Sequence, residues 1–403
     1  MRTCKSLLAL LPILFVNALS GCGASADGDS KTTDDSTGTE ATDKSYDSAL
    51  LEQYRAALPS EDALAAPAPG EATSPNALTL KGNAELANLA AGSARDINAV
   101  PKLMVVLLRT ITKLPPTVYN SDKKEFVWGP WDNEDDYGQV LVYIHENPKG
   151  DDFKYGYALV RLVDSDLATA KPVIWGGGTP GANNDDLRGV GVTLWDFVAN
   201  NEFDKANDPN YDAATARDQG RFAMVFGRGD KADGKFAFNV AVFRNFVPKD
   251  KPESDPANLD YFFGHFKGTD GNVVDFVDWS LDANLCDADA ATCFKDPADG
   301  AAENLGLRAA FFNRGVGRAE AKVSGGDLNT SVNVTECWDA SIDRTGITVS
   351  DDAGMIVNDG QCEGAFASDL DTLGVPSLAD VDPDMLAKMD CAASNGLEAC
   401  KEK

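Results

Sequence analysis

Eight cysteines are the residues of this sequence that are best suited to covalent chemistry. Cys4 and Cys22 lie near the N-terminus, and the other six lie in the last third of the chain. Those six are Cys286, Cys293, Cys337, Cys362, Cys391 and Cys400. The sequence has no CxxC pair and only two histidines, His145 and His265, so the pattern does not favour a structural zinc site. The chemistry of Cys22 decides how the remaining cysteines are counted.

Cys22 follows a segment that has the pattern of a secretory signal peptide. Arg2 and Lys5 give this segment a positive start, and the apolar run 7–16 is too short to span a bilayer. The sequence LSGC at 19–22 resembles the lipobox of bacterial lipoproteins, in which the cysteine receives a lipid. The alternative is an ordinary signal peptide whose cleavage leaves a cysteine nearby.

The lipobox resemblance implies that residues 1–21 are removed and that Cys22 carries a thioether-linked diacylglyceryl group. Each buried methylene contributes about 0.8 kcal/mol, so several acyl chains together would anchor the protein to a membrane. In enteric bacteria an Asp after the cysteine tends to hold a lipoprotein at the inner membrane. Gly23 stands at that position here. The resemblance therefore implies export to the cell envelope, at the outer membrane of a Gram-negative bacterium.

Removal of Cys4 and lipidation of Cys22 leave an even set of six cysteines, which in an exported chain indicates disulfides. Six cysteines allow 15 connectivities. The simplest pairing joins neighbours in sequence: Cys286 with Cys293, Cys337 with Cys362, and Cys391 with Cys400.

The composition narrows the possible partners. The chain has 403 residues and a formal net charge of −28, so it would repel nucleic acid and anionic lipid surfaces. No second apolar stretch is long enough for a transmembrane helix. We expect no nucleic-acid partner, a membrane contact through the lipid on Cys22, and a protein or glycan partner that the sequence does not identify.

The N-terminal third predicts helices and linkers. Residues 24–44 are rich in Ser, Thr, Asp and Gly and predict a flexible tether. Helical spacing appears at 45–58, with Ser45 or Asp47 as a possible cap, and at 83–94 and 101–113. The predicted organisation is a signal peptide at 1–21, a lipidated tether with a short helix at 22–80, a β-rich domain with N-terminal helices at 81–365, and an Asp-rich tail with a possible Cys loop at 366–403.

From Phe126 onward, apolar residues alternate with polar or small ones. In GKFAFNVAVF (234–243), for example, every second residue is a large apolar one, which predicts a half-buried strand. Roughly ten to twelve strands joined by short polar turns favour antiparallel pairing. The predicted fold is mainly β: a large, curled, mostly antiparallel sheet, either a half-barrel or a two-layer sandwich, with the N-terminal helices packed against it.

Two glycine motifs resemble nucleotide-binding loops but lack the required context. Gly229 to Lys235 matches the core of a phosphate loop, yet Phe236 replaces the Ser or Thr that binds magnesium, and a strand follows. The glycines at 176, 178 and 181 match a dinucleotide fingerprint, but no helix follows them. We interpret both segments as turns.

Acidic and aromatic residues offer weaker candidate sites. Asp369, Asp371 and Asp380 fall at positions one, three and twelve of a calcium loop, but Leu373 occupies a ligand position, so calcium is a weak expectation and no other cofactor is predicted. Four tryptophans could form a sugar-stacking platform or could equally belong to the core and rim of the sheet: Trp128, Trp131, Trp175 and Trp195.

Three further segments carry a family resemblance: FVWGPW (126–131), GRAEAKVSGGDL (317–328) and TECWDASIDRTG (335–346). They resemble recurring signatures of large β-rich lipoproteins of myxobacteria and related bacteria, over residues 101–362. A tryptophan expected near Phe312 is absent. The resemblance implies a cell-envelope location and a β-rich fold, and it carries no catalytic residue.

We therefore expect a lipid-anchored cell-envelope protein with a structural or binding role and no predicted catalytic residue. One alternative is a carrier that shelters an acyl chain in a curled sheet, which requires an apolar cavity of several hundred Å³. Another is a hydrolase acting on polysaccharide or peptide, which requires an open cleft with convergent polar groups.

Overall fold

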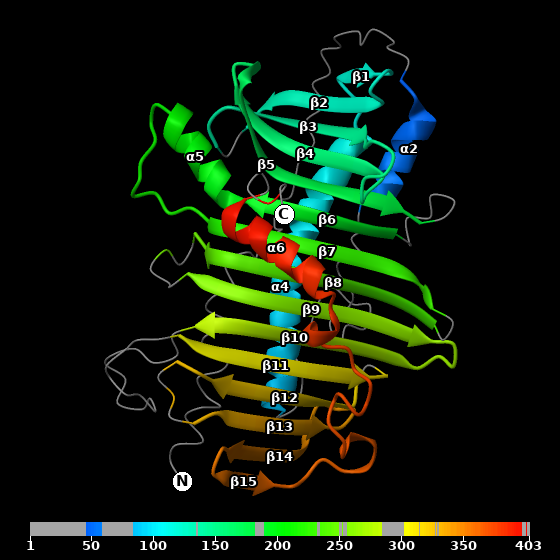
Figure 1. The fold of residues 1–403 in the computed structure, drawn as a ribbon, viewed down its shortest axis with the longest axis vertical. Coiled ribbons are helices and arrows are strands. Elements are labelled where there is room, and N and C mark those ends of the chain that lie inside the picture. The colour runs from blue at the N-terminus through cyan, green and yellow to red at the C-terminus, as the bar shows by residue number, and fades with distance from the viewer. Residues whose placement is uncertain are drawn as a thin grey trace, which may run out of the picture.

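The structure, a computed structural model, places fifteen strands in one antiparallel sheet (Figure 1). It describes residues 46–58, 84–133, 136–181, 189–231, 234–249, 252, 256–283, 302–313, 315–326, 328, 330–396 and 400. Each strand pairs with its neighbours in sequence, so β1 and β15 form the two edges within this described part of the chain. The strands are β1 (Val118–Asn120), β2 (Glu125–Asp132), β3 (Gln139–Glu146), β4 (Tyr155–Val163), β5 (Asp166–Pro180), β6 (Gly189–Asp196), β7 (Gln219–Lys231), β8 (Gly234–Val247), β9 (Ala257–Gly268), β10 (Val273–Ala283), β11 (Glu303–Phe312), β12 (Gly317–Ser324), β13 (Val332–Trp338), β14 (Arg344–Asp351) and β15 (Gly354–Asp359).

The predicted mainly β fold with N-terminal helices against the sheet is confirmed. The strands outnumber the ten to twelve expected and form a single sheet, so the two-layer sandwich is not the arrangement found. Helices cover the sheet instead: α4 (Glu85–Lys113) lies behind it in Figure 1, and α6 (Pro383–Asn395) lies in front. Two further helices are α2 (Ser48–Ala57), which Asp47 caps as expected, and α5 (Phe197–Asn207).

Helix α4 corrects one prediction, because the two helices expected at 83–94 and 101–113 are one continuous helix of 29 residues. A proline inside a helix removes a backbone hydrogen bond, which is why Pro101 suggested a boundary. Buried residues on both sides of it, Ile97, Val105 and Leu108, pack into the same core against the sheet. Burial along one face of the helix outweighs the local cost of the proline.

Polar contacts fix α4 along the sheet from end to end. The carboxylate of Glu336 on β13 accepts the N–H groups of Glu85 and Leu86 at distances of 3.0 and 2.6 Å. At the opposite end of α4, the indole of Trp128 on β2 donates to the carbonyl of Leu114 at 2.9 Å. Between these ends, Ser93 accepts a hydrogen bond from the indole of Trp279 on β10.

Helix α4 thus crosses the sheet from β13 to β2. We call the face of the curled sheet that α4 covers the concave face, and the opposite face the convex face.

The pairing of β7 and β8 shows how both faces of the sheet are used. Phe222 is the register partner of Phe243, so Phe222, Met224 and Phe226 face α4. Val240 and Val242 of β8 face the opposite side. The middle of β8 is thus covered on both faces rather than half-buried, as its alternation had predicted.

Residues 360–396 return over the convex face of the sheet, and we call them the C-terminal strap. Arginines from four strands hold it: Arg318 donates to the carbonyl of Phe366, Arg308 to Val375, Arg244 to the carboxylate of Asp390, and Arg221 to the carbonyl of Ser394. Apolar residues of the strap, including Leu370 and Met389, are buried against the sheet. The segment predicted as an Asp-rich tail is therefore a packed cover.

Two disulfides close the strap. Cys337 of β13 bonds Cys362 at its start, and Cys391 of α6 bonds Cys400. Both pairs are the sequence neighbours that the even cysteine count suggested. Cys286 and Cys293 lie outside the described residues, so their pairing stays a prediction.

Asp278 of β10 lies under the strap, where its carboxylate accepts the N–H of Leu378 at 2.7 Å. The pKa of Asp278 is raised from 3.8 to about 6, chiefly by burial; the Leu378 N–H and Arg308 oppose the shift, and Asp371 and Asp380 add to it. A raised carboxyl pKa means that the folded protein holds this proton more tightly than the unfolded chain does.

We expect Glu336→Ala to lower the free energy of unfolding by about 3 kcal/mol, because two buried helix amides and the guanidinium of Arg344 lose their acceptor. Urea unfolding followed by tryptophan fluorescence measures the change. The exposed Glu363→Ala serves as the control and should stay within about 0.5 kcal/mol of the wild type. Equal losses in the two variants would contradict the capping role.

The contribution of Asp278 to stability is present below about pH 4 and is lost as the pH rises toward 6, because the folded-state pKa is the higher one. We expect Asp278→Asn to remove this dependence and to raise stability at pH 7 by on the order of 1 to 2 kcal/mol, since an amide oxygen can still accept from Leu378. Urea midpoints between pH 4 and 7 test this, with the exposed Asp359→Asn as control. A wild-type pH profile in the Asp278 variant would refute it.

Candidate functional site

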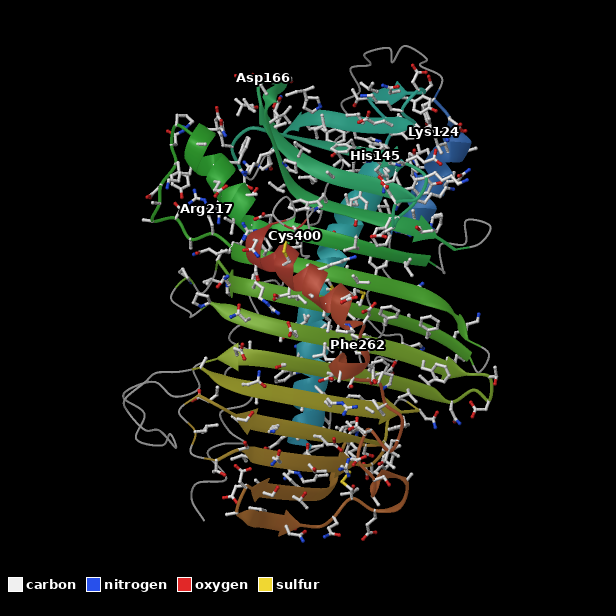
Figure 2. All side chains as sticks on the ribbon, viewed as in Figure 1. Lys124, His145, Asp166, Arg217, Phe262 and Cys400 are labelled. Carbon is white, nitrogen blue, oxygen red and sulfur yellow. A yellow bond between two sulfur atoms is a disulfide. The ribbon has the colours of Figure 1, made fainter. Side chains whose placement is uncertain are left out.

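An open pocket of about 1210 Å³ lies at the β1–β4 end of the sheet. It is lined by the ends of β2 and β3, by the connection 147–154 between β3 and β4, and by Thr179 of β5. Figure 2 places Lys124 and His145 of this pocket beside α2. The pocket lies beyond the strands that α6 contacts, which are β6, β7 and β8.

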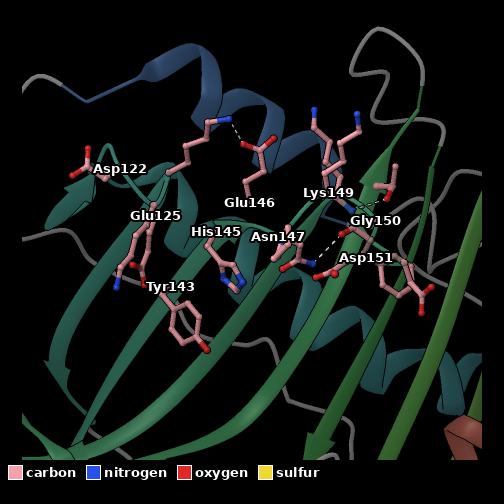
Figure 3. A pocket seen from close by; sticks show the side chains of 16 residues that line it. Asp122, Glu125, Tyr143, His145, Glu146, Asn147, Lys149, Gly150 and Asp151 are labelled. Atoms are coloured by element: carbon pink, nitrogen blue, oxygen red, sulfur yellow. Dashed lines mark hydrogen bonds and ion pairs between the residues drawn. The ribbon is translucent and has the colours of Figure 1, made fainter. Parts of the chain in front are cut away.

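Strand β3 supplies the centre of the pocket because its side chains alternate between the two faces. Val142 and Ile144 are buried in the core on the α4 side, so Tyr143 and His145 point the other way. Figure 3 shows Tyr143, His145 and Asn147 in a row along the strand. The rings of Tyr143 and His145 are stacked, with centroids 5.8 Å apart and planes at 28°.

Glycines on the neighbouring strands let these side chains lie close to the sheet. A Cβ atom at Gly156 of β4 would stand 2.9 Å from both Asn147 Oδ1 and His145 Cε1. A Cβ atom at Gly177 of β5 would stand 3.0 to 3.1 Å from the side chain of Phe153. The side chains of His145 and Phe153 therefore cover glycine backbone, which makes a flat floor.

Charges of both signs surround this floor. Four lysines and five carboxylates line the pocket: Lys123, Lys124, Lys149, Lys154, Asp122, Glu125, Glu146, Asp151 and Asp152. Glu125 is the register partner of His145 across β2 and β3. Lys124 pairs with Glu146, and this hydrogen bond raises the pKa of Lys124. The lining is close to neutral although the chain as a whole is strongly acidic.

Helix α2 borders the pocket from the concave side. The hydroxyl of Tyr54 donates to the carbonyl of Lys124 and is buried, which raises its pKa. Gln53 accepts hydrogen bonds from the hydroxyl of Tyr155 at 3.0 Å and from Nζ of Lys154 at 3.4 Å. The described chain begins at Tyr46, whose ring contacts Phe126 of β2, so the N-terminal segment enters the fold at the pocket end.

The three weak calcium candidates, Asp369, Asp371 and Asp380, each have a separate partner within the protein. Asp369 accepts the N–H of Thr372, Asp371 pairs with Arg308, and Asp380 accepts from Ser377 within a capping box. Among the described residues, no three His, Cys, Asp or Glu side chains come together as a metal would require. The predicted lipidation site, Cys22, lies outside the part of the chain that the structure describes.

The four tryptophans do not form a shared platform. Trp128 is fully buried beneath α4, and Trp131 and Trp195 are partly buried against the same core. Trp175 packs against the second core, on the strap side of the sheet. The interpretation as core and rim residues is the correct one.

The two histidines lie on strands β3 and β9, in different surroundings. Nδ1 of His265 on β9 lies 2.5 Å from the carboxylate of Asp275 on β10, and Asp275 is buried. This pair serves as a cross-strand contact on the α4 face. His145 is the histidine that faces the pocket.

The glycine motif at 176–181 is not a turn, which corrects that prediction, because residues 176–180 belong to β5. A Cβ atom at Gly176 would stand 2.4 Å from the hydroxyl of Tyr157, and one at Gly178 would stand 2.4 Å from the carbonyl of Ala57 in α2. These glycines make room for a tyrosine and for a helix. The other glycine motif, Gly229 to Lys235, joins two paired strands as expected of a hairpin: β7 ends at Lys231, β8 begins at Gly234, and these two residues are register partners.

Sequence reasoning did not identify the row formed by Tyr143, His145 and Asn147. The signal was present as aromatic and polar residues at every second position of a predicted strand. The exposed face of that strand is determined by where α4 and the strap pack. Those positions depend on contacts with residues far away in the sequence, so the strand's own residues do not reveal them.

The space between the sheet and α4 is densely filled. Large side chains with less than 2 % exposure occupy it, including Trp279, Phe222 and Tyr261. The concave side of the sheet is therefore a packed core.

Among the described residues, no helix has both the length and the apolar character that crossing a membrane requires. No protein-family model, curated protein or solved structure matches this chain.

Proposed function

We propose that the protein is a lipid-anchored cell-envelope protein that binds a ligand at the β1–β4 end of its sheet. The observation that carries the proposal is the position of the open polar pocket beside α2, where the N-terminal segment joins the fold. The lipobox-like sequence at 19–22 and the resemblance to myxobacterial β-rich lipoproteins support the anchor.

The proposed anchor and the pocket would lie near one another. The composition of residues 22–45 predicts a flexible chain, whose root-mean-square length would be about 27 Å. The fifteen strands extend over roughly 67 Å from edge to edge. A ligand in the pocket would therefore be held within a few nanometres of the membrane, and β15 would lie farther from it.

The proposal includes no catalytic step, and the carrier alternative has little support. A carrier needs an apolar cavity, but the concave face of the sheet is filled by buried aromatic residues and α4. A sheet with a packed core between its strands and α4 suits a binding scaffold, because ligand contacts on its other face need no rearrangement of that core.

We expect Cys22→Ser to move the protein from the membrane fraction to the soluble envelope fraction, because the acyl chains that supply the membrane affinity would be missing. Fractionation followed by immunoblotting measures this. Cys4→Ser is the matched control, since that cysteine belongs to the predicted leader and its loss should leave fractionation unchanged. Continued membrane association of the Cys22 variant would overturn the anchor.

A further inference from the structure

The pocket at the β1–β4 end presents flat rings bordered by hydrogen-bonding groups. The rings of Tyr143 and His145 stack on each other, with centroids 5.8 Å apart, and form one aromatic pair at the centre of the pocket. Asn147 is held in place by a hydrogen bond from its amide to the carbonyl of Phe153 at 2.9 Å. Glu125 flanks the opposite side of His145. Figure 3 shows Glu125, His145 and Asn147 beside one another in this pocket.

The polar and charged lining argues against three classes of ligand: anionic ligands, metal ions and apolar ligands. An anionic ligand would meet five carboxylates, and two of the four lysines already have partners: Lys124 pairs with Glu146, and Lys154 contacts Gln53 and the ring of Tyr155. A metal ion would need three converging ligands, and the described residues contain no such group. An apolar ligand would leave many polar groups without water.

A neutral polyhydroxylated ligand fits this combination. The C–H face of a pyranose ring packs on aromatic faces, and its hydroxyls both donate and accept hydrogen bonds. Carboxylates accept such bonds, lysine ammonium groups donate them, and an amide side chain does both. The open form of the pocket also leaves room for a chain to continue beyond the bound unit.

We propose that the pocket binds a neutral saccharide chain, with one sugar ring packed against the Tyr143–His145 pair and its hydroxyls bonded to Glu125 and Asn147. This inference rests on the proposed binding role and names its ligand class. An open, shallow site implies weak affinity, with a Kd on the order of 0.1 to 1 mM.

The glycine floor explains why the rings can be used in this way. An edge of the His145 ring, with atoms Cε1 and Nε2, and the Oδ1 atom of Asn147 lie next to Gly156. Any side chain at that position would displace both groups, because a Cβ atom would stand within 2.9 to 3.2 Å of them. Gly156 is thus a positioning residue for the saccharide-binding surface.

The test uses the full chain, purified in detergent, with chitohexaose and maltohexaose as neutral probes and a heparin hexasaccharide as an anionic probe. Saturation-transfer difference NMR on the sugar protons measures binding. We expect one of the neutral probes to bind, and Tyr143→Ala and His145→Ala each to weaken it about 5-fold. Tyr211→Ala, which removes a tyrosine from the loop after α5, is the matched control and should leave the affinity unchanged.

Gly156→Ala keeps every ring in the chain and tests the same surface without deleting a contact. We expect it to weaken binding of the neutral probe while the urea midpoint stays near that of the wild type. The absence of neutral-probe binding at about 5 mM would overturn the inference, and so would binding of heparin alone. Neither binding result changes what the fractionation of the Cys22→Ser variant shows. Failure of the saccharide assignment is therefore distinguishable from failure of the proposed anchor.

Discussion

The structure depends on α4 and the C-terminal strap, the two elements that cross the strands of a sheet whose pairing is otherwise entirely local. Each strand bonds only to its neighbours in sequence, so the ladder alone does not relate β2 to β13. Helix α4 makes that connection on the concave face, where Glu336 accepts the amides at its first turn and Trp128 donates to the carbonyl that follows its last. A carboxylate at a helix N-terminus is favoured both by hydrogen bonds and by the helix dipole. This contact thereby fixes where the helix starts against β13.

The pocket lies where the sheet is no longer covered by the C-terminal strap. The strap covers the convex face over the strands that supply its arginines, from β7 to β12, and α6 extends to β6. Strands β2 and β3 lie beyond these strands, and their α4 side is covered by α2 and the end of α4. On their other side, Tyr143 and His145 are only half-buried. Strand β4 differs, because its residues 155–162 are buried on both faces. The same alternation along β8 leads to two buried faces instead of one. Identical local patterns thus have different consequences, and the difference is set by elements that lie far away in the sequence.

Much of the fold was predictable because it is local. Period-two alternation identified the strands, short polar turns identified antiparallel hairpins, and Asp47 identified the start of α2. The errors occurred where distant contacts override local preference. Pro101 suggested a helix boundary that packing against the sheet does not permit, and the glycines at 176 and 178 suggested a turn although they accommodate Tyr157 and α2. The Asp-rich C-terminal segment looked like a tail because its partners are arginines on four separate strands. The candidate site escaped prediction for the same reason, since its exposure is a property of the whole sheet.

The near neutrality of the pocket matters because the rest of the chain is so acidic. A surface with a formal net charge of −28 repels anionic polymers at long range, and salt weakens that field only beyond about 10 Å. A neutral saccharide is not repelled, so its recognition depends on short-range stacking and hydrogen bonds within the pocket. Such contacts are weak for a single open site. Many copies anchored in one membrane would present their pockets at a similar height, and a long glycan could engage several of them at once. Multivalent binding of this kind raises the effective affinity without any new contact, which is a physical reason for the proposed combination of a shallow site with a lipid anchor.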